Sequence, residues 1–208
     1  MEEPDLDCPT PDELAGDAEW WRIYNESFPA QEREPANVIL KSLRDSAGIA
    51  FRVRQGGITC GIATTHLLLR PPAVFLVYLA IDARRRGGGD GGALFEFAWR
   101  ESSARLRAAG VEAIGMIWEV DQQGSECERR IRFFERQGAT LLRRPYRQPP
   151  VNGTDPVPMG LMFRPGSDAM PPPDDATVEA LVREMYFGKY GAVNGIPAPL
   201  LERLLSTA

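Results

Sequence analysis

The chain has 208 residues, of which 43% are apolar and 25% are charged, a composition typical of a folded globular protein rather than a disordered one. This length suffices for one sizeable domain with a small appendage. The net charge of −5 argues against a general nucleic-acid-binding protein, which usually carries a basic excess. No run approaches the ~18 consecutive apolar residues of a membrane span, and the acidic start lacks the apolar core of a signal peptide.

Three widely spaced cysteines and a single histidine, His66, leave little material for metal or nucleophilic chemistry. Without a CxxC pair, neither a disulfide framework nor a zinc site is expected, and a reducing cytoplasm fits this usage best. His66 falls in a predicted strand without the partners of a catalytic triad, so we expect a structural role. We therefore predict a cytoplasmic protein with no metal, no nucleic-acid partner and no membrane partner.

The first predicted elements are helices, which give way to strands. Residues 1–16 are rich in proline and acidic residues and are expected to form a loose lead-in. Residues 17–46 are expected to be helical in two pieces, interrupted near two prolines. Apolar and polar residues then alternate over 50–54 and again over 58–62, on either side of Gln-Gly-Gly, which is typical of a β-hairpin.

The middle of the chain has a mixed pattern of strands and helices. Residues 74–81 form an almost continuous apolar run, which predicts a central strand covered on both faces. The run leads into a glycine-rich loop and then a helix over 92–109, which Gly110 ends. The elements expected after it are a strand over 111–118, a helix over 126–137, and short strands around 140–143 and 159–163 that flank a proline-rich loop.

Residues 166–208 form a C-terminal extension, in which a proline-rich stretch precedes two expected helices. Apolar residues follow the i, i+3, i+4, i+7, i+8 spacing of one helix face: Val178, Leu181, Val182, Met185 and Tyr186. We expect this face to cover the sheet, with binding to a partner as the alternative.

The segment from Leu79 to Gly92 carries the strongest chemical signal. It has the sequence LAIDARRRGGGDGG, in which a buried strand enters a loop with five glycines and leaves it as a helix. Glycines let backbone N–H groups converge on an anion, and the start of a helix adds partial positive charge. Three consecutive arginines add full charge. This combination predicts a pyrophosphate-binding site, with a merely flexible loop as the alternative.

Two common pyrophosphate motifs fit this loop less well. A nucleotide P-loop ends in Gly-Lys-Ser/Thr, whereas Gly92 is followed by alanine and leucine. Gly87, Gly89 and Gly92 match the dinucleotide fingerprint G-x-G-x-x-G, but that motif belongs in a βαβ unit. The strands before this loop are predicted to form an antiparallel hairpin. A dinucleotide-dependent oxidoreductase is therefore the less favoured interpretation.

At these residues the chain resembles the GNAT superfamily of N-acetyltransferases. RGGGDG, at residues 86–91, matches its motif Arg/Gln-x-x-Gly-x-Gly/Ala, and LAID at 79–82 resembles the strand that precedes it. FFERQGA, at residues 133–139, resembles the helix ending FYExxGA/F of the same family. The resemblance covers residues 17–165.

The resemblance implies both a fold and a reaction. The fold would be α/β (α+β), with a mixed, mostly antiparallel sheet that is splayed between residues 74–81 and 111–118 and flanked by helices. The reaction would be acetyl transfer from acetyl-CoA directly to a primary amine of a small molecule or peptide, without a metal. The identity of the acceptor, the length of the acyl chain and whether the protein forms a homodimer are left open.

The resemblance also implies which residues hold the cofactor. Acyl-CoA would lie in the splay, with its pantetheine along the backbone of Leu79, Ala80 and Ile81, and an N–H group near Leu79 would stabilise the oxyanion. The backbone N–H groups that would hold the pyrophosphate are those of Arg86, Gly87, Gly88, Gly89, Asp90, Gly91 and Gly92. Arginines between residues 129 and 147 could reach the 3′-phosphate of CoA, although a solvated helix face is the simpler explanation.

Phe134 departs from the family pattern. Many members carry a tyrosine there that protonates the departing thiolate, and a phenyl ring cannot donate a proton. A thiolate with a pKa near ~8.5 can leave without a strong acid, and an ordered water could substitute for one. An inactive CoA-binding protein is the alternative. Phe134 would then contribute only to cofactor binding.

The candidate base lies at the end of the strand that faces the splay. Glu119 and Asp121 are the best-placed acids, and Glu119 could take a proton from an ammonium, with Tyr78 as the second catalytic candidate. The alternative for Glu119 is a solvated acid at a strand end. The candidate acceptor-binding residues are Tyr24 and Phe28, for which core packing is the alternative, and Tyr146 in the proline-rich loop.

Overall fold

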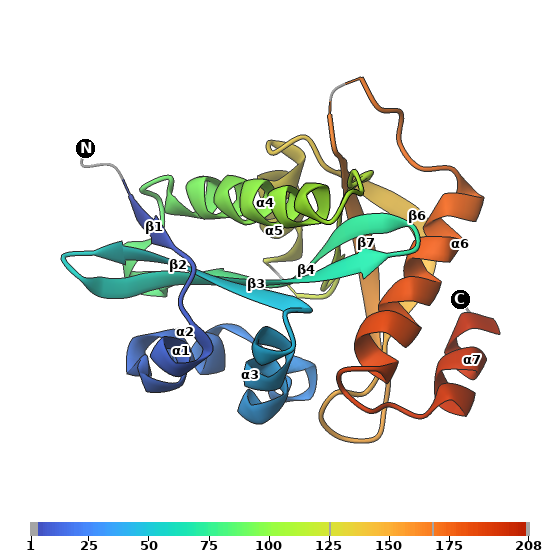
Figure 1. Ribbon diagram of the computed structural model, residues 1–208, viewed down its shortest axis with the longest axis horizontal. Helices are drawn as coiled ribbons and strands as arrows, with labels where there is room; N and C mark the ends of the chain where they lie inside the picture. Colours follow the sequence, from blue (N-terminus) through green and yellow to red (C-terminus); the bar gives the residue numbers. More distant parts are fainter. Residues whose placement is uncertain (1–3, 125, 168, 207–208) are drawn as a thin grey trace.

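A computed structural model describes residues 4–124, 126–167 and 169–206. In this part of the chain one sheet with the strand order β1-β2-β3-β4-β5-β7-β6 runs through the middle of the molecule (Figure 1). Neighbouring strands are antiparallel except for β4 and β5, which are parallel. The strands are β1 (Asp5–Asp7), β2 (Gly48–Gln55), β3 (Ile58–Leu69), β4 (Pro72–Ile81), β5 (Gly115–Val120), β6 (Thr140–Gln148) and β7 (Val157–Pro165).

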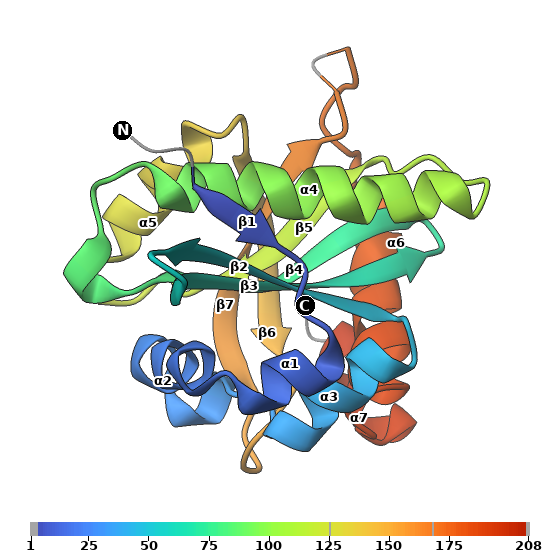
Figure 2. The same ribbon diagram turned by 60° about the vertical axis from the view of Figure 1, so that its left-hand side comes forward.

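Helices cover both faces of the sheet. On one face lie α4 (Asp90–Ala108) and α5 (Cys127–Glu135), as Figure 2 shows for α4. One half of the other face is covered by α1 (Pro11–Gly16), α2 (Ala18–Ser27) and α3 (Ala36–Arg44). The other half is covered by α6 (Asp175–Glu184), the π-helix η3 (Met185–Gly191) and α7 (Ala198–Ser206). None of the helices among the described residues is long and apolar enough to cross a membrane.

A β-bulge interrupts the middle of β4. Tyr78 pairs with Thr64 and Leu76 pairs with Thr65, so Val77 has no partner of its own in β3. Side chains alternate between the faces of a strand, and the extra residue reverses that alternation. Leu76 therefore packs on the α4 face, whereas Tyr78 packs against α2 on the opposite face. The apolar run shows no alternation in the sequence because helices cover both faces of β4.

β4 and β5 separate directly after the bulge begins. Their parallel pairing joins only Val74, Phe75 and Leu76 to the facing residues of β5. A bulged strand bends, and the end of β4 leaves the direction of β5 at this point. The turn η2 (Ala83–Arg85) and the start of α4 follow at the open end of the splay. The sheet thus opens between two strands whose carboxyl ends point the same way.

The structure confirms the expected hairpin (β2 and β3), the central strand and the helix after the glycine loop. The expected loose lead-in is wrong for the described residues. Asp5 and Asp7 lie in a strand that pairs with β2, and both carboxylates form ion pairs with Arg54. Thr10 then forms a capping box with Glu13 at the start of α1. A local helix signal was therefore present in a segment that composition alone marks as loose.

The boundaries of three strands, β5, β6 and β7, also differ from the expectation. Residues 111–114 lie before β5, which begins only at Gly115. β6 and β7 extend into the segment expected as a proline-rich loop, so the connection between them is reduced to residues 149–156. Tyr146 is buried in β6 for this reason. In the C-terminal extension η3 continues α6 without a break, so the extension has the two expected helical segments, α6 with η3 and then α7.

Candidate active site

A cleft of about 930 Å³ opens where β4 and β5 separate. This volume is within the range of small-molecule and cofactor sites, about 300–1,000 Å³. The end of β4 forms one wall, and β5 with α5 forms the other. The lining includes every residue of the glycine loop from Arg86 to Gly92, together with Leu79, Ala80, Ile81, Tyr78, Phe28, Trp118, Glu119, Phe133 and Phe134.

The glycine loop presents its backbone to this cleft. The six consecutive N–H groups from Arg86 to Gly91 donate to no acceptor within the described part of the chain. Gly87 and Gly89 have φ angles of 95° and 93°, which residues with a side chain rarely adopt. Gly89 also precedes the first residue of α4. Free N–H groups at the start of a long helix form an anion-binding site, so the loop fits a pyrophosphate.

The charges around the loop favour an anion. Arg85 donates to the Gln55 side chain at 2.6 Å and Arg86 to the Ile81 carbonyl at 3.3 Å, and within the described residues neither pairs with a carboxylate. The Asp90 carboxylate is turned toward Gln55, whose Nε2 donates to it at 2.8 Å. No group of three or more potential metal ligands occurs in the described part of the chain.

The end of β4 offers further backbone donors. The Asp82 N–H donates to the Cys60 carbonyl of β3 at 2.9 Å. Because N–H groups alternate in direction along an antiparallel strand, those of Leu79 and Ile81 point away from β3. On that side β5 has already separated, and both residues line the cleft. This edge can pair with an extended ligand that carries amide groups.

Glu119 lines the opposite wall, and each of its carboxylate oxygens accepts a hydrogen bond. Tyr146 donates to Oε1 at 2.5 Å and Tyr190 donates to Oε2 at 2.7 Å. Burial raises the pKa of Glu119 to about 7, although the two hydroxyl groups act in the opposite direction. A carboxylate with a pKa near neutrality can accept a proton from an ammonium group.

The hydroxyl of Tyr78 is bound to the main chain instead. It donates to the Glu32 carbonyl at 2.8 Å and accepts from the Glu34 N–H at 2.9 Å. Burial raises the pKa of Tyr78 well above 10. The phenol therefore stays protonated at neutral pH and cannot serve as a base. This argues against the expected catalytic role of Tyr78.

The three expected acceptor-binding residues have different positions. Phe28 is partly exposed and lines the cleft. Tyr24 is buried in the aromatic cluster under α2, with its ring stacked on Trp20, and does not line the cleft. Tyr146 was expected in the proline-rich loop, but it lies in β6, where its hydroxyl contacts Glu119. Asn152 of that loop donates to the Ala30 carbonyl at 2.9 Å, which closes the loop over the turn η1 (Ala30–Glu32).

Phe134 forms part of an aromatic wall of the cleft. Its ring centroid lies 4.7 Å from that of Trp118, 5.0 Å from that of Phe133 and 5.6 Å from that of Phe95. The residue is 6% exposed. Its position at the cleft agrees with the expectation, and the structure places an apolar ring where the family pattern has a phenol.

Tyr190, which donates a hydrogen bond to Glu119, is the residue near the candidate base that the sequence analysis missed. It lies in the C-terminal extension, far along the chain from Glu119. A signal was present, because Lys189 and Tyr190 interrupt an apolar helix face, and buried polar atoms need partners. The sequence gives no indication of which partners these are. His66 is 4% exposed, and burial and Lys189 lower its pKa to about 3, so it is neutral, in keeping with a structural role.

Comparisons with known proteins establish the fold. No protein-family model matches the chain, and no curated protein matches it in sequence. A protein from Bacteroides thetaiotaomicron assigned to the GNAT acetyltransferases is similar in structure, with 21% identity, a TM-score of 0.65, and coverage of 92% of this chain and 99% of that one. The chain thus has the fold of the GNAT acetyltransferases.

Two further solved structures share this fold. The ribosomal-protein-S18-alanine N-acetyltransferase from Escherichia coli has 20% identity and a TM-score of 0.57, with coverage of 80% of this chain and 96% of that one. A Salmonella typhimurium protein, solved with its cofactor acetyl-CoA, has 14% identity and a TM-score of 0.57, with coverage of 84% and 99%.

Proposed function

We propose that the protein is an acetyl-CoA-dependent N-acetyltransferase that acts on a primary amine. The observation that carries this proposal is the meeting of three features in one cleft: the free N–H groups of the glycine loop, the unpaired edge of β4 and a carboxylate with a pKa near neutrality. The fold is shared with a protein solved with acetyl-CoA and with one named for acetylation of an alanine, which supports the same chemistry here.

The residues present fit acetyl-CoA as the co-substrate. The N–H groups from Arg86 to Gly91 would hold its pyrophosphate, and that of Ile81 would pair with its pantetheine. Acetyl-CoA supplies a thioester, an activated acyl group. Phe133 and Phe134 would exclude water from one side of the pantetheine channel.

In the proposed transfer, Glu119 acts as the base and the Leu79 N–H as the oxyanion donor. Glu119 accepts a proton from the acceptor ammonium, which leaves a lone pair on nitrogen. That nitrogen attacks the thioester carbonyl carbon, so a C–N bond forms and the C–S bond breaks. The Leu79 N–H stabilises the negative charge that develops on the carbonyl oxygen. The attacking nitrogen loses its second proton as the amide forms, and because Phe134 has no hydroxyl, this proton reaches the departing thiolate through water.

A second candidate function is a CoA-binding protein without transferase activity. Phe134 favours it, because the position has no proton to donate. Glu119 argues against a protein without activity, because a carboxylate with a pKa near 7 can act as a base. The oxidoreductase interpretation is not retained: β4, α4 and β5 form one parallel βαβ unit, but every other neighbouring pair of strands is antiparallel, whereas a dinucleotide-binding fold is built on a mostly parallel sheet.

The decisive experiment measures binding and transfer separately. Calorimetry with acetyl-CoA and with NAD tests the cofactor, and thiol release with a panel of amines tests the reaction. Glu119→Gln should lower kcat/KM by ~10²–10⁴-fold and leave the affinity for acetyl-CoA unchanged, because Gln keeps the shape of Glu but accepts no proton. Asp121→Asn is the matched control, since Asp121 lines the same cleft two residues further on.

The results separate the candidates. Failure of the folded protein to bind acetyl-CoA would contradict the proposal, and binding without transfer to any amine would favour the non-catalytic protein. In the active enzyme, kcat/KM should rise with pH to a plateau with a midpoint near 7, the pKa of Glu119. That rise should be missing in Glu119→Gln and present in Asp121→Asn.

A further inference from the structure

The C-terminal extension enters the core of the molecule through its π-helix. The turns of a π-helix are wider than those of an α-helix, and π-turns are frequent at functional sites. In η3 three polar side chains face inward: Tyr186 and Tyr190 are fully buried and Lys189 is 2% exposed. Each of them binds a different part of the chain.

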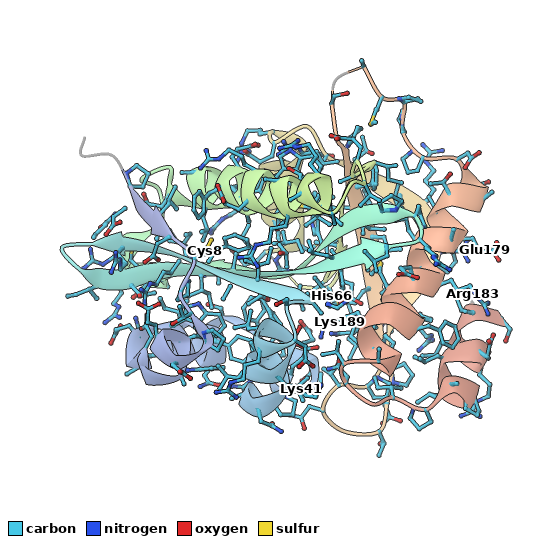
Figure 3. All side chains as sticks on the ribbon, in the orientation of Figure 1. Cys8, Lys41, His66, Glu179, Arg183 and Lys189 are labelled. Carbon is cyan, nitrogen blue, oxygen red and sulfur yellow. The ribbon has the colours of Figure 1, made fainter. Side chains whose placement is uncertain are left out.

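Two of these contacts hold the extension in place. The Tyr186 hydroxyl donates to the Arg147 carbonyl of β6 at 2.6 Å. Lys189 forms an ion pair with the buried carboxylate of Glu34, and Asn194 donates to the same carboxylate oxygen at 2.7 Å. Figure 3 labels Lys189 close to His66 of β3, at the junction between the sheet and the extension.

The third contact reaches the candidate base. Tyr190 and Tyr146 come from different elements, η3 and β6, and each donates its hydroxyl to one oxygen of the Glu119 carboxylate. Rotation of the carboxylate group would break both hydrogen bonds, so its plane is fixed. Burial raises the pKa of both tyrosines well above 10, and they therefore remain donors at any pH at which the protein works. Neither ring lines the cleft, whereas Glu119 does.

We propose that Tyr146 and Tyr190 are positioning residues for Glu119, and that the C-terminal extension is therefore part of the catalytic centre instead of a mere cover for the sheet. The inference rests on the proposed role of Glu119 as the base. It assigns to the extension a task that the apolar pattern of its first helix does not indicate. The two hydroxyl groups stabilise the ionised carboxylate and aim it into the cleft.

The other charged and titratable groups near Glu119 are Glu34, Glu32 and Tyr186. The two carboxylates raise the pKa of Glu119 by repulsion, and Lys189 lies against Glu34. The charge of Glu119 raises the pKa of Tyr186, but the Tyr186 hydroxyl donates its hydrogen bond to a main-chain carbonyl. All of these groups stay in place when only the hydroxyl of Tyr190 or Tyr146 is removed, so a change in the titration of Glu119 reports on that hydroxyl.

The test removes one hydroxyl at a time. In Tyr190→Phe and Tyr146→Phe the ionised carboxylate loses a donor, so the pKa of Glu119 should rise by about one pH unit. Carbon-13 NMR of protein labelled at glutamate carboxyls measures this, with the Glu119 signal assigned by its loss in Glu119→Gln. The low-pH limb of kcat/KM should move up by the same amount, and kcat/KM at pH 6 should fall about tenfold.

Tyr186→Phe is the matched control. It removes a buried hydroxyl from the same π-helix, and that hydroxyl binds a carbonyl and not Glu119. The variant should lose stability and leave both the titration of Glu119 and the pH profile unmoved. Equal shifts in Tyr186→Phe and Tyr190→Phe would mean that the tyrosines act only by holding the fold, and would overturn the inference.

The titration also separates this inference from the proposed function. An unchanged Glu119 midpoint in folded Tyr190→Phe would overturn the positioning role, whatever the activity. Should the wild-type protein transfer acetyl to no amine, the proposed function would fail, and a raised midpoint would still establish that the tyrosines hold the carboxylate. If Tyr190→Phe does not fold, Tyr146→Phe in β6 provides the same measurement.

Discussion

The two ends of the cleft are built in opposite ways. At the proposed cofactor end, one contiguous segment from Leu79 to Gly92 supplies the donors, and nearly all of them are main-chain N–H groups. At the proposed acceptor end, Glu119, Tyr146 and Tyr190 come from three different elements, β5, β6 and η3, and only side chains are involved. The first end depends on local backbone conformation, and the second depends on how the C-terminal extension docks.

This difference has consequences for robustness. A main-chain site is specified by glycines that permit its φ angles, so changes elsewhere in the chain should leave it intact. A side-chain site built across elements fails when any of the elements shifts. Variants that displace the extension, and do not merely remove one of its hydrogen bonds, should therefore impair catalysis before they impair cofactor binding.

The largest expected effect comes from Lys189→Met, which tests whether the extension is locked by its buried ion pair. Lys189 and Glu34 are almost completely buried, so the variant leaves a carboxylate without its cation. Loss of one partner of a buried pair costs about 3–5 kcal/mol of stability, which urea denaturation measures. In the folded fraction, the affinity for acetyl-CoA should be retained while transfer falls.

Two variants check the cause of that loss. Arg183→Met breaks an exposed ion pair with Glu202 in the same extension, and it should change stability by less than about 1 kcal/mol. Glu34→Gln combined with Lys189→Met removes the unpaired charge and should recover part of the loss. A Lys189→Met protein as stable as the wild type would show that the ion pair does not hold the extension.

The next effect concerns the charge of the glycine loop. Gly88 has an ordinary φ angle, and a Cβ there would meet nothing closer than 3.9 Å, so both Asp and Asn fit. Gly88→Asp should weaken acetyl-CoA binding by about 10- to 1,000-fold, because like charges ~4 Å apart repel by about 1–4 kcal/mol. Gly88→Asn has the same shape without the charge and should bind within a few fold of the wild type. Calorimetry that finds equal affinities for the two variants would place the pyrophosphate elsewhere.

A third effect is on stability as a function of pH. The pKa of Glu119 is raised from its ordinary value of 4.5 to about 7, so between these values the folded state binds more protons than the unfolded state. Stability from this group therefore falls as the pH rises from 4.5 to 7. The stability of Glu119→Gln should not fall in this way with rising pH. At pH 8 its free energy of unfolding should exceed that of the wild type by at most about 3 kcal/mol, and by less where cleft water screens the charge. Thermal unfolding at pH 5 and pH 8 measures it, and a pH-independent difference between the two proteins would contradict the raised pKa.

The smallest effect is expected at Phe134, on the cofactor side. Phe134→Tyr adds a hydroxyl where the family pattern has its acid, and general acid help is worth ~10²–10⁴-fold when fully aligned. A transplanted group is not aligned in advance, so transfer should rise by at most about tenfold or remain unchanged, as steady-state rates would show. A folded variant that binds acetyl-CoA but has lost nearly all activity would mean that the apolar ring itself is required.

The residues of the proposed cofactor end could be predicted from the sequence alone. The strand, the glycine loop and the helix are adjacent in the chain, and their physical properties are local: glycines set the backbone, and the start of α4 leaves N–H groups free. The motif at residues 86–91 and the helix ending at 133–139 then indicated the fold. Glu119 could be named as an acid at a strand end, but its environment could not.

Only the tertiary structure decided the acceptor end. The bulge at Val77 reverses the alternation of β4 and turns Tyr78 toward the main chain of residues 32–34, which binds its hydroxyl and argues against a role as a base. The pKa of Glu119 depends on burial by elements that are distant in sequence, and one of its two hydrogen-bond donors comes from the extension. An apolar helix pattern predicts that a face is buried, but it does not show which buried acid its tyrosine will meet, because that partner is fixed by the packing of the whole chain.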